Sequence, residues 1–123
     1  MSRTVRYFAV AVGLFMFVLG IWAFASPRSF YTQIAPWPPY NQHLFHDVGA
    51  FQSGLGATLI VAAFVSDALL VALTGAAVGS VIHAISHIID RANGGRATDP
   101  VALSILAALM VIAAVLRARE RSR

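Results

Sequence analysis

Six side chains of this sequence could bind a ligand or transfer a proton, and they stand on both sides of one dipeptide. They are four histidines and two acids: His43, His46, Asp47, His83, His87 and Asp90. The dipeptide at residues 66–67 divides them, with His46 and Asp47 about twenty residues before it and His87 about twenty after it. If the flanking segments are helices folded back on each other, these groups lie level, roughly 30 Å from the dipeptide. We therefore expect one polar cluster near one end of a helix hairpin.

Helical spacing makes this cluster a candidate metal site. His83, His87 and Asp90 follow i, i+4, i+7 spacing and share one helix face. Two histidines one turn apart can ligate one ion, as in helical zinc sites. The histidines and the acid that precede residue 66 would complete the ligand set. A sulfur-free site favours zinc, copper or iron as the metal.

Other interpretations of the same residues stay open. Neutral histidines that bond a carboxylate or a backbone carbonyl would form a structural clasp without any ligand. His46 and His87, on facing helices, could instead contact haem as axial ligands, or contact a quinone. Movement of protons or a solute, and pH sensing by histidine, are further alternatives.

The composition indicates an integral membrane protein. Of 123 residues, 59% are hydrophobic and 11% charged, and the mean hydropathy is +0.75. A soluble domain of this length buries too little surface to shelter so many apolar side chains. All nine basic residues are arginines, and they stand near segment ends, where membrane topology rather than nucleic-acid binding explains them. The absence of cysteine excludes disulfides and thiolate ligands.

The hydrophobic pattern predicts a single all-α domain, residues 1–123, built as a four-transmembrane-helix bundle. A hydrocarbon core of about 30 Å needs about 20 helical residues. Four segments qualify: about 7–25, 42–65, 68–89 and 100–116. Asp99 is expected to cap the last helix and Pro100 to begin it. Residues 117–123 are expected to form a basic cytoplasmic tail.

The arginines predict the orientation. With both termini inside, six arginines lie inside (Arg3, Arg6, Arg117, Arg119, Arg121 and Arg123) and three lie outside (Arg28, Arg91 and Arg96). This excess predicts cytoplasmic termini in a bacterial cytoplasmic membrane. The histidine cluster then faces outward.

The first outer loop, about residues 26–42, is predicted to be ordered. Ser26 and Pro27 are suited to begin a short helix, and three later prolines stiffen the chain. Its aromatic residues are of types that settle at a membrane interface. Asn41 is expected to cap the following helix.

Polar and small residues are concentrated in the second and third spans. This distribution predicts that these two spans form the inner hairpin. Gly75 and Gly79 form a small-xxx-small pair, and Gly49, Gly54 and Gly56 keep the preceding span slim. Such faces let helices approach closely, within a bundle or between copies.

The same sequence lacks the catalytic motifs of hydrolases, nucleotide-binding enzymes and metalloproteases, which favours a non-enzymatic role. The leading hypothesis is an accessory or structural membrane protein that contacts the lipid bilayer and binds a second copy or a larger membrane complex. The alternative is a protein that binds a metal or a redox cofactor at the histidines.

Several segments resemble a known family. They are Pro39-Tyr40-Asn41-Gln42-His43-Leu44, Asp47-Val48-Gly49-Ala50, Ser26-Pro27-Arg28-Ser29-Phe30-Tyr31 and His83-Ala84-Ile85-Ser86-His87. Together they are similar to a family of small, uncharacterised actinobacterial membrane proteins, with a four-span plan similar to that of DoxX-like proteins. The resemblance implies the four-span fold and brings no activity. In that family's pattern the position of His46 is often arginine, which cannot ligate a metal. The resemblance thus favours His43, His83 and His87 as ligands.

Overall fold

Five helices account for most of the described chain in the computed structural model, which describes residues 2–65 and 68–122. They are α1 (Arg3–Ala25), α2 (Pro27–Gln33), α3 (Gln42–Ala62), α4 (Ala68–Ile89) and α5 (Asp99–Arg121). The all-helical prediction is confirmed. Of these helices, α1, α4 and α5 are long and apolar enough to cross a membrane.

The outer surface of the molecule is itself apolar. Large side chains such as Phe51 (81% exposed) and Val71 (73% exposed) point away from the protein interior. In water this exposure would be an aggregation hazard, whereas in lipid it is the expected surface. Together with the three long apolar helices, it indicates a membrane protein.

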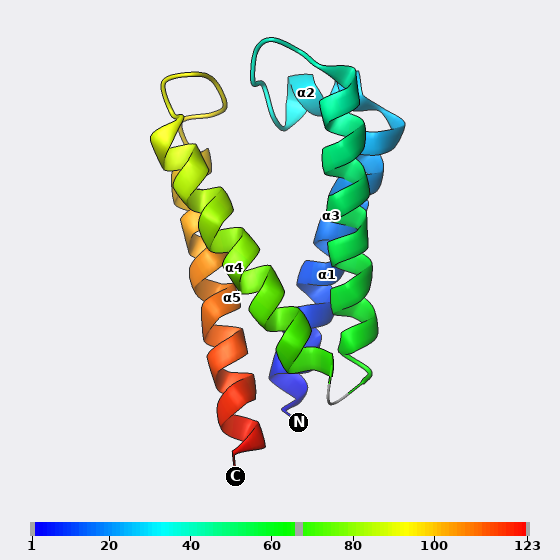
Figure 1. Cartoon of the computed structure of the whole chain (residues 1–123), viewed down its shortest axis with the longest axis vertical. Coiled ribbons are helices and arrows are strands. Elements are labelled where there is room, and N and C mark those ends of the chain that lie inside the picture. Colours follow the sequence, from blue (N-terminus) through cyan, green and yellow to red (C-terminus); the bar gives the residue numbers. More distant parts are fainter. Residues whose placement is uncertain (1, 66–67, 123) are drawn as a thin grey trace.

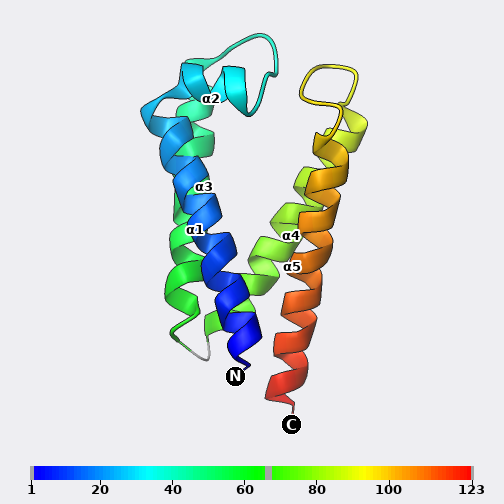
Figure 2. The ribbon, with the colours of Figure 1, turned by 180° about the vertical axis from the view of Figure 1, so that it is seen from behind.

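The helices form two antiparallel pairs that diverge from each other (Figures 1 and 2). In the first pair α1 packs along α3, and in the second α4 packs along α5. By contrast, α3 and α4 make few contacts with each other. The prediction that these two form a close inner hairpin is therefore wrong. The dipeptide at residues 66–67, the expected hinge, lies outside the described residues.

Glycine explains why α3 packs on α1 instead of α4. A Cβ on Gly49 would come within 2.7 Å of the Gly20 carbonyl oxygen, and one on Gly56 within 2.6 Å of the Gly13 carbonyl oxygen. The two backbones therefore touch at two points, seven residues apart on each helix. Backbone contact of this kind is a main source of helix association in lipid.

Two apolar cores hold the molecule together. The larger lies where the helices converge, and α1, α3, α4 and α5 all contribute to it; its fully buried members are Leu59, Leu69, Leu73 and Met110, together with several alanines. The smaller one is aromatic and lies between α2 and the adjoining ends of α1 and α3. It centres on Phe30 and Phe45, whose rings are 6.0 Å apart.

The two pairs are also connected at both ends of the molecule. At the terminal end, the Ser2 backbone N–H donates to Glu120 Oε2 over 3.1 Å. At the opposite end, the Gly95 N–H donates to the Pro36 carbonyl over 3.1 Å. Gly95 has a φ of +77°, and a Cβ there would lie 2.6 Å from the Trp37 ring. This turn therefore requires glycine for both its conformation and its contact.

The sequence located four of the eight ends of the long helices, at residues 25, 42, 68 and 89. The helix α1 begins at Arg3 rather than at about 7, and α3 ends at Ala62 rather than at about 65. The short helix after Pro27 is confirmed, and the Asn41 side chain caps α3 by accepting from the Leu44 N–H over 3.2 Å. The start of α5 differs, because Thr98 occupies the N-cap and the Asp99 carboxylate accepts from the Arg96 N–H instead.

The end of α5 also differs from the prediction. The helix continues to Arg121, through residues expected to form a tail. Arg117 is buried and donates to Glu120 over 3.2 Å, and this ion pair lies one helical turn along α5. Glu120 in turn accepts from the Ser2 N–H, so that the helical continuation is tied to the start of α1.

The α1–α3 contact predicts opposite effects for two glycines on α3. Gly56→Ala should destabilise the protein by about 1–3 kcal/mol because its Cβ would overlap the α1 backbone. Gly54→Ala should be neutral or stabilising by up to about 1 kcal/mol, since nothing lies within 4 Å of its Cβ position. Unfolding in mixed detergent, followed by helical circular dichroism, compares the two. Equal destabilisation by both substitutions would contradict this packing.

Candidate functional site

Two imidazoles on the last turns of α4 contact each other directly. Because His83 and His87 are four residues apart on one helix, their side chains lie on the same face. Their Nε2 atoms are 3.1 Å apart and their ring centroids 4.8 Å apart. At this distance one Nε2–H donates to the other Nε2, whichever ring carries the proton.

Two other segments approach the second of these histidines. Trp37, from the connection between α2 and α3, meets the His87 ring edge-on with centroids 5.1 Å apart. Asp99, the first residue of α5, places Oδ2 3.9 Å from His87 Nδ1. The His87 side chain is 15% exposed, and its Nδ1 is buried without a hydrogen bond among the described residues. We name these four residues the His83–His87 site: His83, His87, Trp37 and Asp99.

The Asp99 carboxylate favours one of the two arrangements of the shared proton. A distance of 3.9 Å is too long for a hydrogen bond, but it places the carboxylate nearest to His87 Nδ1. A proton on His87 Nδ1 is therefore stabilised by Asp99, which leaves His87 Nε2 as an acceptor. His83 Nε2–H is then the donor of the 3.1 Å bond.

The predicted ligands on α3 lie elsewhere. His43 pairs with Asp47 one turn later, with 3.5 Å between His43 Nε2 and Asp47 Oδ2, and both side chains are largely exposed. The His46 ring packs against Phe24 of α1, at 5.1 Å between centroids. None of the three has a contact with α4 among the interactions of the described residues. The expected single cluster is thus divided, because α3 follows α1 rather than α4.

The last predicted ligand, Asp90, also has a local role. Its Oδ1 accepts from Asn93 Nδ2 over 3.5 Å, in the turn between α4 and α5. Within the part of the chain that the structure describes, no three histidine, aspartate or glutamate side chains gather closely enough to hold a metal ion. The predicted site of six residues is therefore not assembled, and its two α4 histidines remain as a pair.

Sequence reasoning missed two members of this site. The sequence predicts Asp99 only as a helix cap, and Trp37 is one of the loop aromatic residues that it predicts at a membrane interface. The available signal was the short turn after His87, since a glycine-rich turn between two antiparallel helices returns the start of the second beside the end of the first. Nothing in the sequence indicated Trp37, whose position depends on the contact between the α2–α3 and α4–α5 connections.

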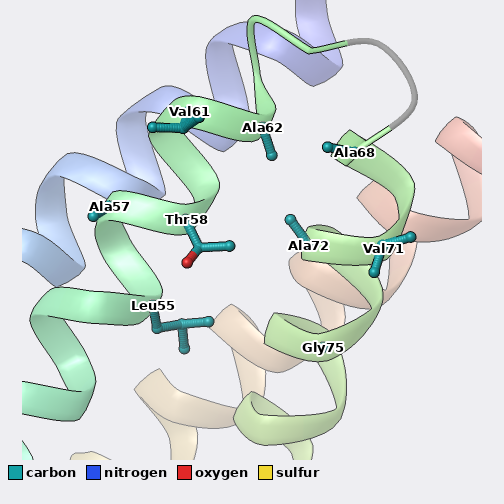
Figure 3. A pocket seen from close by; sticks show the side chains of 9 residues that line it. All are labelled: Leu55, Ala57, Thr58, Val61, Ala62, Ala68, Val71, Ala72 and Gly75. Carbon is teal, nitrogen blue, oxygen red and sulfur yellow. The ribbon is translucent and has the colours of Figure 1, made fainter.

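An apolar cleft of about 760 Å³ lies between α3 and α4, away from the histidines (Figure 3). Its lining residues are Leu55, Ala57, Thr58, Val61, Ala62, Ala68, Val71, Ala72 and Gly75. The side chains of Thr58 and Leu55 point from α3 towards the space, and Ala72 points from α4. On α4, Gly79 and His83 continue the row of Ala72 and Gly75 at helical spacing. The cleft wall on α4 therefore leads towards the histidine pair.

Comparison of the chain with protein-family models, curated proteins and solved structures finds no match. Its function must therefore be argued from its own residues.

Proposed function

We propose that this chain is a four-span membrane protein with both termini in the cytoplasm, acting as an accessory or structural protein that associates with a second copy of itself. The four-span plan is supported by α3, whose 21 residues correspond to about 31 Å of helix. Because α3 runs antiparallel along α1 (Figure 1), a membrane spanned by α1 is also spanned by α3. The Ser2–Glu120 hydrogen bond supports termini on one side.

The proposed association rests on a difference between two groups of glycines. The glycines of the α1–α3 interface are in backbone contact, but no atom of the described residues lies within 4 Å of the Cβ positions of Gly54, Gly75 and Gly79. A glycine inside a helix costs about 0.5–1 kcal/mol relative to alanine. Among the described residues, these three glycines receive no compensating contact. Gly75 and Gly79 have GxxxG spacing, which supports close helix pairing in lipid.

A second copy is the partner that fits this face best. A GxxxG face is self-complementary, because two such faces allow the closest approach of two backbones. Two-fold pairing through α4 would give both chains the same environment, as in most homodimers. The large exposed residues nearby on α4, such as Val71, Val78 and Ile82, are apolar and suit a helix interface in lipid.

The topology predicts which residues are accessible outside the cell. Because the chain has no cysteine, single-cysteine variants report position directly. Thr32→Cys and Asn93→Cys should react with a membrane-impermeant maleimide on intact cells, whereas Ser2→Cys and Ser122→Cys should react only after permeabilisation. If α3 did not cross the membrane, positions 32 and 93 would lie on opposite sides, and only one would react.

The association predicts a site-specific loss of dimers. Gly75→Leu and Gly79→Leu should each raise the dimer dissociation constant by about tenfold or more, equivalent to about 1.4 kcal/mol. Thr74→Leu is the matched control, since it adds bulk to an exposed position turned about 100° from Gly75. Energy transfer between labelled chains in liposomes measures the dimer fraction. Equal effects of all three substitutions, or a monomeric wild type, would refute pairing through this face.

A second candidate function is ligand binding at the His83–His87 site. One observation favours it: side chains from α5 and the α2–α3 connection meet the His87 ring of α4, whose Nε2 lies 3.1 Å from that of His83. Polar groups at this depth of a membrane helix are costly, and they commonly mark functional positions.

This second candidate predicts a molecule that co-purifies with the protein. Elemental analysis, a visible spectrum and native mass spectrometry on protein isolated in mild detergent with a histidine-free tag should detect it. The His83→Gln/His87→Gln variant should lose it, although glutamine retains a donor and an acceptor for the hydrogen bonds. A wild type that carries only lipid and has no affinity for added Zn²⁺ or Cu²⁺, or a ligand retained by the variant, would exclude this function.

A further inference from the structure

We propose that His83 and His87 bind one divalent transition-metal ion through their two Nε2 atoms, an inference that rests on the second candidate function above. The two atoms are already converged at 3.1 Å. Two metal–nitrogen bonds of about 2.0–2.1 Å spanning this separation enclose an angle of about 100°. That angle lies between the square-planar and tetrahedral values, so that an ion can enter with little movement of either ring.

The surroundings of His87 favour the tautomer that metal binding requires of this ring. Both Nε2 atoms bind an ion only when each ring carries its proton on Nδ1. Asp99 Oδ2 lies 3.9 Å from His87 Nδ1 and stabilises the proton there. A carboxylate behind a ligating histidine is the usual arrangement, and it makes the ring a better donor to the metal. Asp99 is therefore a positioning residue, held in place by the Arg96 N–H at 2.8 Å.

Metal binding at this pair neither releases nor takes up a proton overall. In the empty pair one Nε2–H donates to the other Nε2. The ion takes the place of that shared proton, and the proton moves to Nδ1 of its own ring. Two neutral imidazoles therefore bind the ion without net proton release.

The donor set determines the class of ion. Imidazole without thiolate suits Zn²⁺, Cu²⁺ and Ni²⁺, and the affinity of nitrogen sites rises to a maximum at Cu²⁺. Since no third ligand lies close by within the described residues, the remaining coordination positions are left to donors that are not side chains of this site. His83 lies on the exposed side of the pair, which leaves that side of the ion accessible.

Titration of detergent-purified protein, carried on a histidine-free tag, tests the inference. Calorimetry should show one Zn²⁺ or Cu²⁺ per chain, with tighter binding of Cu²⁺. In Trp22→Phe protein, Trp37 is the only tryptophan, and its ring lies 5.1 Å from His87. Cu²⁺ bound at the pair should therefore quench the remaining fluorescence in a stoichiometric manner.

The variants separate this pair from the other histidines. His83→Gln/His87→Gln should abolish stoichiometric binding, and Asp99→Asn should weaken it about 10–100-fold. His43→Gln/His46→Gln is the matched control, because it removes as many histidines from α3, and it should bind as the wild type does. If the double α4 variant does not fold, His83→Gln alone changes only an exposed residue and should still lose the copper quenching.

Three outcomes would overturn the metal site. They are a wild type without affinity for either ion, full stoichiometry in the α4 variants, and an equal loss in the α3 control. An organic molecule that co-purifies through these histidines, without affinity for Zn²⁺ or Cu²⁺, would reject the metal and retain the ligand site. Absence of both a co-purifying molecule and metal affinity would reject both proposals.

Discussion

The arrangement of this molecule depends on the backbone contact between α1 and α3. Gly20 meets Gly49 and Gly13 meets Gly56, at distances that leave no room for a Cβ on either α3 glycine. Because one face of α3 is occupied by α1, that face cannot also pack on α4. The second pair of helices therefore leans against the first only where the larger core lies, and the cleft between α3 and α4 follows from this geometry.

The same contact explains why only two of the six predicted ligands lie together. His43, His46 and Asp47 begin a helix that is fixed to α1, so that they remain on the first pair. The α4 histidines instead obtain their neighbours through short connections. Asp99 reaches them through the turn within the second pair, and Trp37 reaches them through the contact between the Pro36 and Gly95 segments. The site is thus built by loops at the place where the two pairs meet again.

Local features were predictable from the sequence, and long-range ones were not. Apolar length located α1 and α4, Asn41 marked the start of α3, and Pro27 marked α2, since each signal acts within a few residues. The pairing of helices could not be predicted, because small residues on α3 and on α4 gave equal signals for close packing. Only the complementary positions Gly13 and Gly20 on α1 decide between them, and they occur in a span that appeared uniformly apolar. The histidine pair was predictable because i, i+4 spacing is itself a local rule.

The helix glycines of this fold occur in two kinds of place, an interface within the chain and an exposed face, and this difference bears on the function. Where α1 meets α3, glycine allows two backbones of one chain to touch. Along α4, at Gly75 and Gly79, the same residue type leaves a bare backbone strip beside an apolar cleft. Lipid chains would cover a strip of larger apolar residues equally well without the conformational cost of glycine. A bare strip is therefore better explained by a second backbone that approaches it than by lipid. Since His83 continues the row of Gly79 by one turn, a helix that packs along this strip would pass beside the histidine pair.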